Sequence, residues 1–458
     1  MKRNGRSRRL RVAVGSESLL SSAGGSLLLE AAELVGLPRL LSGALAPWRA
    51  PRATHDPAKV LLDLATAIAL GGDCLSDVAV VRAQPDLFGH VASDPTVSRL
   101  IATLAQDAPA ALTAIRRARA QARARVWDLA PIASTNTSLD GWLVVDLDAT
   151  LVDAHSEKEG AQPTFKRGFG HAPLLAFVDH GTGGTGECVA AMLRPGKANA
   201  NNAADHISVL TAALAQLPED LRSRVVVRGD SGAGTHDFVD HITGLGLRYS
   251  VGIAGWPTVL DGLANVPRQA WKAALDPDGF PREGAQVAEL TRYVPQATGH
   301  RHWPADMRII ARRERPHPGA QLRITDTDGW RITIFATNQP GRIADLEVQH
   351  RLRARAEDRI RQLKDTGLRN LPLHGFTQNE IWLELVALAS DLLAWTQMLA
   401  LTGTPARTWE PKRLRLRLLN TAGRIVRSGR RDWLRLPRGW PWNDILLAGH
   451  DRLNALTP

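Results

Sequence analysis

Two runs of β-branched residues that each end in a carboxylate constrain this chain more than any other feature. The first, GWLVVDLDATLVDAH, is the clearest predicted strand and contains Asp146 and Asp148. Side chains two residues apart in a strand point to the same face, so both acids project together. Carboxylates beside a hydrophobic sheet are costly unless a cation neutralises them, so the pattern favours a site for Mg²⁺ or Mn²⁺. The alternative is a strand end that exposes two acids to solvent.

The second run, SRVVVRGDSGAG, reaches Asp230 directly before a glycine-rich turn. Ligands of open α/β sheets gather at the carboxyl ends of strands. Asp230 is therefore a candidate to share one site with the first pair of acids. An aspartate that only caps a turn would have the same local sequence.

A third acid, Glu357, lies in the helical segment HRLRARAEDRIRQLKD. Successive offsets of three, four and seven residues put His350, Arg353, Glu357 and Lys364 on one face of a helix. A surface helix with many ion pairs would show the same alternation of charge. The functional interpretation depends on convergence, because two acids on strand ends and one on a later helix can jointly hold two metal ions that act on a phosphodiester.

The charge balance indicates the class of partner. The 458 residues include 57 Lys and Arg against 46 acidic residues, which gives a formal net charge of +11 and a pI near 10.4. This excess favours a polyanion, with nucleic acid as the first candidate, although a GC-rich genome also enriches arginine. Two cysteines exclude a disulfide framework, and no apolar run predicts a signal peptide or a membrane helix. We therefore expect a cytoplasmic, nucleoid-associated protein with no membrane partner.

Patterning along the chain divides it into parts of different character. A basic arm precedes an Ala/Leu-rich helical region, strands and a helix then favour a mixed α/β sheet, and a β-rich stretch is followed by further helices. The corresponding ranges are 1–15, 24–125, 141–234, 250–340 and from 343 onward, with an arginine-rich stretch at 411–438.

Two segments of the helical region are candidates for DNA contact. The helix that begins in SDPTVSRLIATLA carries Thr96, Ser98 and Arg99 and would either read DNA or form part of an ordinary bundle. A later helical run has five arginines, which we expect on a solvated face that follows phosphates if DNA is the partner. These are Arg116, Arg117, Arg119, Arg123 and Arg125.

The face that carries Glu357 resembles a known signature. His350-x2-Arg353-x3-Glu357-x6-Lys364 has the spacing of Y-x2-R-x3-E-x6-K, found in a large group of insertion-sequence transposases that use a DDE triad. The departure is His350 in place of the usual Tyr, and histidine keeps a hydrogen-bond donor at that position. The segments LDATLVDAHSEKEGAQPTFKRGFGHAPLLAF, RGDSGAG and RQLKDTGLRNLP resemble the insertion-sequence-1380 family over about residues 140–375.

This resemblance implies an α/β fold: an RNase H-like catalytic core interrupted by a β-rich insertion and preceded by an α-helical N-terminal domain. Asp148, followed by Ala149 and Thr150 as in the family's Asp-x-Thr pattern, would be the first catalytic and metal-binding acid. Asp230 and Glu357 would be the second and third, and a contribution of Asp146 stays open. The implied parts are a DNA-binding domain with its basic arm at 1–135, core at 140–250 and 341–400, insertion at 251–340 and a basic C-terminal tail at 401–458.

Cofactors and partners follow from the same resemblance. The expected cofactor is Mg²⁺ or Mn²⁺, as two ions, and the expected partners are double-stranded transposon ends, target DNA and a second copy of the chain. Arg353 and Lys364 would bind phosphates, with His350 at the usual Tyr position. Trp330, with Trp303 as a second candidate, would stack on a flipped base.

The predicted function is that of a bacterial insertion-sequence transposase, which binds terminal inverted repeats, cleaves the ends and joins them to target DNA. One alternative is a transposase-derived DNA-binding protein without activity, although all three acids are present. The other is a phosphatase of the haloacid-dehalogenase type, because DLDATLV is similar to its DxDxT motif, with Asp146 as nucleophile and Asp148 as acid/base. In that alternative Asp237 lies too far from Asp230 for the family's second acidic element.

Overall fold

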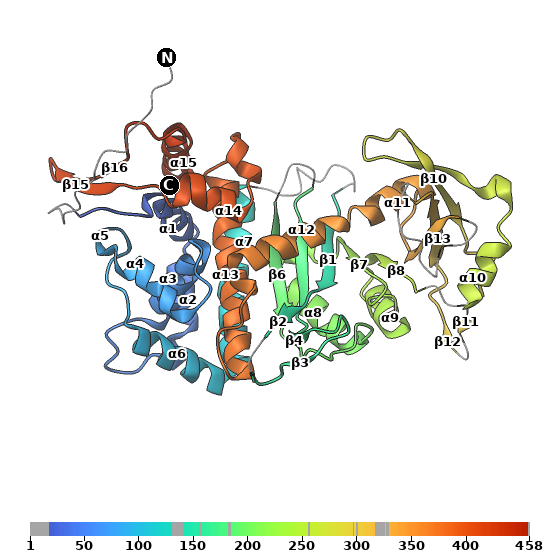
Figure 1. Cartoon of the computed structure of the whole chain (residues 1–458), viewed down its shortest axis with the longest axis horizontal. Coiled ribbons are helices and arrows are strands. Elements are labelled where there is room, and N and C mark those ends of the chain that lie inside the picture. The colour runs from blue at the N-terminus through green and yellow to red at the C-terminus, as the bar shows by residue number, and fades with distance from the viewer. Residues whose placement is uncertain are drawn as a thin grey trace, which may run out of the picture.

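The computed structural model describes residues 18–130, 141–154, 157–181, 185–254, 257–295, 297–298, 301–316, 326 and 329–456. Figure 1 shows an elongated molecule with helices of the N-terminal part at one end, a sheet in the middle and the strands of the predicted insertion at the other end. The predicted basic arm, residues 1–15, lies outside the described residues.

Short helices form the N-terminal end, as the Ala/Leu-rich pattern predicts. They are α1 (Ser26–Leu34), α2 (Leu37–Ala44), α3 (Pro57–Ala69), α4 (Val78–Arg82), α5 (Pro85–Phe88), α6 (Asp94–Gln106) and α7 (Ala108–Leu129). Proline stands in the first turn of five of them, where its missing N–H removes no helical hydrogen bond. Asp56 caps α3 by accepting the N–H of Ala58 at 2.8 Å.

The centre of the molecule is a nine-stranded mixed sheet with the order β6-β5-β1-β7-β8-β14-β13-β10-β9. β1 pairs antiparallel with β5 and parallel with β7, and β7 pairs parallel with β8. The first five strands are β1 (Leu143–Ala149), β5 (Leu174–Asp179), β6 (Gly186–Met192), β7 (Val225–Gly229) and β8 (Arg248–Gly252). β5 and β7 are buried at every position, as expected for strands covered on both faces.

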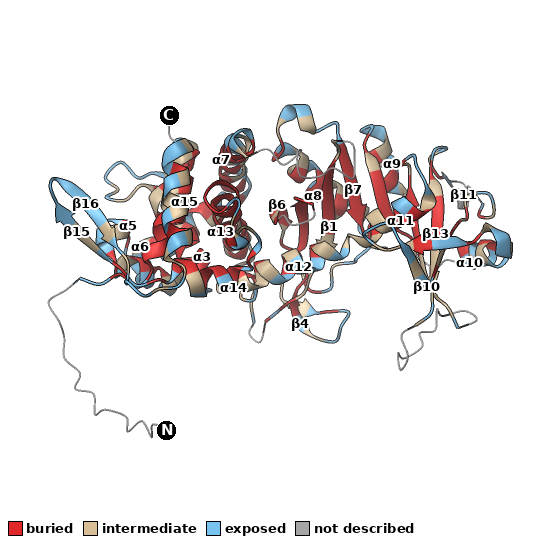
Figure 2. Ribbon diagram, turned by 90° about the horizontal axis from the view of Figure 1, so that it is seen from above, coloured by how far each residue is buried: buried red, intermediate tan, exposed pale blue. Residues whose placement is uncertain are grey.

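Helices cover both faces of this part of the sheet. They are α8 (Ala203–Ala215), α9 (His236–Gly244), α11 (Ile343–Arg351), α12 (Ala354–Leu363) and α13 (Phe376–Leu399). Figure 2 shows α8 and α9 on one side and α11 and α12 on the other. Since α12 packs on β1 and β5, it brings the predicted Glu357 helix to the strand that carries the first two acids.

The stretch predicted to be β-rich continues the central sheet. Its strands are β9 (Lys272–Leu275), β10 (Pro281–Glu289), β11 (Ala297–Thr298), β12 (Arg301–His302), β13 (Arg308–Glu314) and β14 (Arg331–Thr337), with one helix, α10 (Pro257–Ala264). β14 pairs antiparallel with β8, so the stretch extends the sheet. A separate small sheet, β2-β4-β3, comprises β2 (Val152–Asp153), β3 (Gln162–Pro163) and β4 (Phe169–His171).

Helix α13 joins the N-terminal helices to the sheet. It is buried along almost its whole length and packs on α1, α3, α6 and α7 as well as on β6. A helix that is apolar on every side belongs in the core of a large protein. None of the described helices combines the length and apolar character needed to cross a membrane.

The arginines of α7 correct one expectation. Arg119 and Arg123, predicted on a solvated or phosphate-binding face, are completely buried. Arg119 pairs with Glu384 and with Asp391 at 2.8 Å, and Arg123 pairs with Glu187 at 2.8 Å and Asp391 at 2.7 Å. Buried charges persist only where partners neutralise them, and here the partners lie on α13 and β6.

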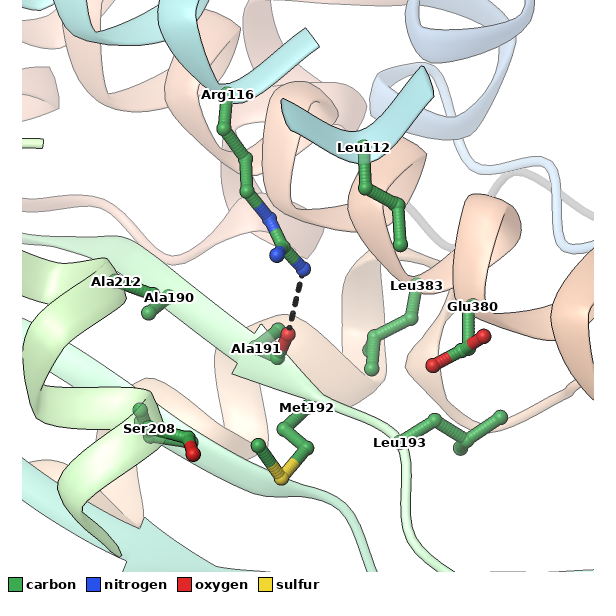
Figure 3. Close-up of a pocket in the computed structure, with 11 residues that line it drawn as sticks. Leu112, Arg116, Ala190, Ala191, Met192, Leu193, Ser208, Ala212, Glu380 and Leu383 are labelled. Atoms are coloured by element: carbon green, nitrogen blue, oxygen red, sulfur yellow. Dashed lines mark hydrogen bonds between the residues drawn. The ribbon is translucent and has the colours of Figure 1, made fainter. Parts of the chain in front are cut away.

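Neighbouring arginines of the same helix have different environments. Arg116 is partly buried and donates to the Ala191 carbonyl oxygen at 3.1 Å (Figure 3) and to Glu384 at 2.8 Å. Arg117 and Arg125 are exposed, and Arg125 donates to the Val35 carbonyl at 2.8 Å. Most of the run therefore stabilises packing within the chain.

Residues after 400, predicted to form a basic tail, fold back onto the N-terminal helices. Leu20 and Gly423 form a β-bridge, and α15 packs on α1. His450 on α15 contacts Glu30 on α1 at 2.7 Å. The described elements are α14 (Pro411–Leu414), β15 (Arg424–Ser428), β16 (Arg431–Arg435) and α15 (Asn443–Leu456).

Candidate active site

Asp148 and Asp230 lie at neighbouring strand ends. β1 and β7 pair so that Asp146 is opposite Arg228 and Leu147 is opposite Gly229, and the register continued by one residue sets Asp148 opposite Asp230. Neighbouring strands are about 4.8 Å apart, which brings two carboxylates to one edge. The turn after β7 holds Asp230 in place, since its Oδ1 accepts the Gly232 N–H at 2.9 Å.

Asp146 is in a different environment, although it is only two residues from Asp148. It is 1% exposed, and Arg228 donates to both of its carboxylate oxygens at 2.7 Å. Arg228 also donates to Asp179 at 3.0 Å and to the Gln349 carbonyl at 2.9 Å. Burial acts to lower the pKa of Arg228, but Asp146 and Asp179 outweigh it and raise that pKa, so the guanidinium stays charged. Asp146 therefore joins β1 to β7 and is not available as a ligand or nucleophile.

Helix α12 brings the third acid close to this edge. Arg353, which precedes the helix, places Nη1 3.8 Å from Oδ2 of Asp148. Glu357, one turn further on, is exposed, and its charge acts on Asp148. The three predicted acids are thus neighbours in space, but their ligand atoms do not all lie within 4.8 Å of one another.

The electrostatics of Asp148 fit a cation site. Burial is the largest cause that raises the pKa of the Asp148 carboxyl, the charges of Asp230 and Glu357 act in the same direction, and the resulting pKa is about 6. Arg353 and the Ala149 N–H act in the opposite direction. Three carboxylates that repel one another at a partly open edge form the hard-oxygen donor set that Mg²⁺ or Mn²⁺ prefers.

A second group of ligand-type side chains, Asp73, Cys74 and Asp77, also lies close together among the described residues. Hydrogen bonds within this group explain why its side chains lie close together. Oδ2 of Asp77 accepts the N–H groups of Asp73 at 2.8 Å and Cys74 at 3.1 Å, at the start of the short helix Leu75–Asp77. This group is a helix cap.

A cavity of about 510 Å³ opens beside Asp230. Its lining includes four basic side chains, namely Lys166, Arg167, Arg194 and Lys364. Nζ of Lys364 donates to the Leu151 carbonyl at 2.9 Å, just after the strand that carries Asp148. Lys364, predicted to bind phosphate, is thus part of a basic wall next to the acids.

The sequence-based site did not include the turn between β3 and β4, which lines this cavity. Phe165 is 74% exposed, Nζ of Lys166 lies 5.6 Å from its ring, and Arg167 has a positive φ of 63°. The fragment TFKRGFG carries the only available signal, an aromatic residue followed by two cations and a glycine. Nothing local to that fragment indicates that it folds beside Asp230.

His350 lies in the core in this structure. It is 8% exposed, its ring stacks on Phe335 with centroids 4.3 Å apart, and Nδ1 is 2.9 Å from the Ser250 hydroxyl. Burial lowers the pKa of His350 to about 3, so the ring is neutral near pH 7. Its environment is that of a packing residue of α11 that is shielded from solvent.

The two tryptophan candidates differ in accessibility. Trp303 is 5% exposed and stacks on His236 with centroids 3.6 Å apart. Trp330 is partly exposed at the start of β14, with the guanidinium carbons of Arg313 and Arg315 4.8 and 4.2 Å from its ring centroid. Of the two, only Trp330 has a ring within reach of solvent.

Residues 2–458 match the family model described as Transposase DDE domain group 1. Among solved structures, a chain of a piggyBac transposase synaptic complex with hairpin DNA is 8% identical, with a TM-score of 0.42; the match covers 88% of this chain and 80% of that chain. A comparison with curated proteins finds no match.

Proposed function

Because the chain belongs to the group 1 family of transposase DDE domains, we propose that it cleaves DNA at the ends of a mobile element and joins those ends to a target. In this proposal Asp148, Asp230 and Glu357 are the catalytic acids, and the element is a bacterial insertion sequence of the insertion-sequence-1380 family. The observation that carries the proposal is the parallel pairing of β1 and β7, which ends at Leu147 and Gly229, directly before Asp148 and Asp230, together with the effect of Asp230 and Glu357 on the pKa of Asp148.

The sheet order supports an RNase H-like core as part of this proposal. Strands β6, β5 and β1 are successive antiparallel neighbours, and β7 and β8 then follow in parallel with β1. The first two acids stand at the ends of the neighbouring strands β1 and β7, and the third comes from α12, which packs on β1 and β5. The strands β14, β13, β10 and β9 would then be the insertion, added at the edge that β8 leaves open.

Asp148, Asp230 and Glu357 would hold the metal, as two ions of Mg²⁺ or Mn²⁺. When bound, the ions supply an activated attacking oxygen and charge stabilisation for the leaving oxygen of the phosphodiester. The chain itself provides ionised carboxylates at neutral pH, since the pKa of Asp148 is about 6. Arg353 balances part of that charge and is positioned to move to a phosphate when DNA enters.

The basic wall of the cavity suits the DNA strand next to the cleaved bond. Lys166, Arg167 and Lys364 would pair with successive phosphates, and the exposed ring of Phe165 would stack on a base. Trp330 would make a second stacking contact from the insertion, held by the two arginines over its ring. Two ends must be paired for joining, so we propose that the DNA complex contains two copies of the chain.

The phosphatase alternative is disfavoured by Asp146. Its nucleophile would have to be a carboxylate that is almost completely buried and held by two hydrogen bonds from Arg228. The remaining alternative, a DNA-binding protein without activity, differs from the proposal only in whether DNA is cut. That difference can be measured directly.

The test is cleavage of a duplex that carries the inverted repeats bracketing the gene, with Mg²⁺ present. Asp148→Asn, Asp230→Asn and Glu357→Gln should each reduce cleavage by about 10³-fold or more, because several kcal/mol of transition-state stabilisation are lost. Binding of the same duplex should be retained. Asp358→Asn, which removes an exposed neighbouring acid on the same helix, is the matched control and should cleave normally. Cleavage retained by any of the three variants would remove that residue from the triad.

A further inference from the structure

The strands β15 and β16 form a hairpin that belongs to no other sheet. Its two-residue turn consists of Gly429 and Arg430, both with positive φ (60° and 64°), as in a type I′ turn. Figure 1 shows the hairpin projecting from the end of the molecule that carries the N-terminal helices, and Figure 2 shows most of its surface exposed. It therefore adds a basic ribbon to the surface at a place separate from the catalytic edge.

The register gives the hairpin two different faces. Residues directly opposite each other share a face, and one face combines three arginines with a tryptophan. We call this the arginine face; it consists of Arg424 opposite Arg435, Val426 opposite Trp433, and Ser428 opposite Arg431. The other face pairs Ile425 with Leu434 and Arg427 with Asp432.

The positive charges and the exposed tryptophan ring of the arginine face are unfavourable when no partner covers them. Arg431 and Arg435 of this face are exposed, and like charges held near each other repel. A lone two-stranded hairpin is only marginally stable in water, and Trp433 leaves 45% of its surface exposed. Arg430 and Arg431 form no ion pair with any residue that the structure describes. A polyanion bound on this face would relieve the repulsion and cover the ring.

We propose that the arginine face of the β15–β16 hairpin binds in a groove of duplex DNA, away from the site of cleavage. A two-stranded β-ribbon fits the major groove of B-DNA, and guanidinium groups pair with phosphates in a planar, two-point geometry. The segment 424–438 contains six arginines and one acid, Asp432. Arg435 lies over the Trp433 ring at 5.3 Å, which orients the ring as an apolar contact between cations. The proposal rests on the proposed function only in taking DNA as the partner.

The test measures binding of the full chain to a roughly 30-base-pair duplex, about three helical turns, in EDTA so that no strand is cut. The double variant Arg431→Ala/Arg435→Ala should bind about tenfold or more weakly. Its plot of log affinity against log salt should be less steep by about two, because each lost phosphate contact removes close to one unit of slope. Trp433→Ala should weaken binding further than Trp433→Phe, which keeps a ring.

The charge-matched control is Arg427→Ala/Arg222→Ala. It removes one exposed arginine from the other face of the hairpin and one from beside α8. The control should bind several-fold more tightly than the arginine-face variant, with both melting as the parent does. Equal weakening of DNA binding by both double variants would mean that only the total charge of the protein matters, and it would overturn the proposal.

A second outcome would overturn it in another way. If the arginine-face variant kept its DNA affinity but lost a dimer that sedimentation detects in the parent, the face would bind protein. Failure of the proposed function is distinguishable from both outcomes, since it would appear as normal binding in EDTA with no cleavage when Mg²⁺ is added.

Discussion

Helix α7 and the β15–β16 hairpin are both rich in arginine, and the two regions use that residue in opposite ways. Arg119 and Arg123 of α7 are completely buried, whereas Arg430 and Arg431 of the hairpin are exposed. In α7 the guanidinium groups form ion pairs with acids of α13 and β6. In the hairpin the strand opposite supplies further arginines and a single acid. The surroundings of a charge, and not the residue type, decide whether it stabilises the fold or is left for a partner.

The two aspartates of β1 show the same difference within one strand. Asp146 faces Arg228 across the sheet, whereas Asp148, at the next position on that face, lies close enough to Asp230 for their charges to interact. A buried acid with a cation opposite becomes part of the core, and a partly open acid with another acid opposite becomes a site for a cation. Replacing Asp146 is therefore expected to lower the free energy of unfolding, whereas replacing Asp148 is expected to raise it in the absence of metal.

The largest effect is expected at the buried arginines. Arg123→Ala leaves Glu187 and Asp391 in the interior without one of their cationic partners, and should lower the free energy of unfolding by about 3–5 kcal/mol. Urea denaturation measures this loss. Arg117→Ala, on the exposed side of the same helix, is the control and should stay within about 0.5 kcal/mol of the parent. Equal losses of stability in the two variants would contradict the comparison, because buried and exposed arginines would then contribute alike.

A somewhat smaller loss is expected at the buried aspartate. Asp146→Asn keeps the shape of the side chain but removes its negative charge opposite Arg228. Arg228 then retains Asp179 as a charged partner at 3.0 Å. The free energy of unfolding should fall by about 2–3 kcal/mol, near the lower end for a broken buried pair. Denaturation at neutral pH without metal is the measurement. No loss would mean that Asp146 is not a structural residue.

Asp148→Asn should have the opposite sign in the absence of metal. The folded pKa of Asp148 is about 6, raised from 3.8, so folding favours the protonated carboxyl and the chain loses stability as pH rises from about 4 through 6. At neutral pH the variant should gain about 1–3 kcal/mol, since two pKa units correspond to at most about 3 kcal/mol. Denaturation in EDTA at about pH 4 and pH 7 should show a gain only at the higher pH. A gain in stability of equal size at both pH values would show that removal of the Asp148 charge is not its cause.

The smallest effect on stability is expected in the hairpin. Arg431→Ala removes an exposed charge that forms no ion pair with the residues that the structure describes, so the free energy of unfolding should change by less than about 0.5 kcal/mol. A small gain would agree with relief of repulsion among the arginines. A loss of several kcal/mol in the free energy of unfolding, comparable to that of Arg123→Ala, would show that arginines stabilise the fold in both regions.

Much of the candidate site could be predicted because its signals are local. A β-branched run followed by an acid predicts a strand end. The spacing around Glu357 predicts a helix there, but the single helix face predicted from His350 to Lys364 is wrong, because the segment divides into α11 and α12. The family assignment that this spacing suggested, a DDE transposase, agrees with the match over residues 2–458. The roles of Asp148, Asp230 and Glu357 remain predictions, and so do the division into domains and the assignment to the insertion-sequence-1380 family.

Contacts between distant segments could not be predicted in this way. The arginines of α7 have the spacing of a solvated face, and the acids that pair with them in the core come from β6 and from α13, the latter more than 250 residues further along the chain. His350 has the spacing of a functional residue, but Phe335 and Ser250 enclose it. The β3–β4 turn lies beside Asp230 only because two separate segments meet there.

The sequence by itself determined which residues are candidates for the chemistry, since strand and helix periodicity and residue type are local properties. Only the tertiary structure decided which charges lie together: Asp148 near Asp230, Asp146 opposite Arg228, and the arginines of α7 against α13. The physical reason is that the cost of a charge depends on burial and on its nearest partner, and both are set by segments far apart in the chain.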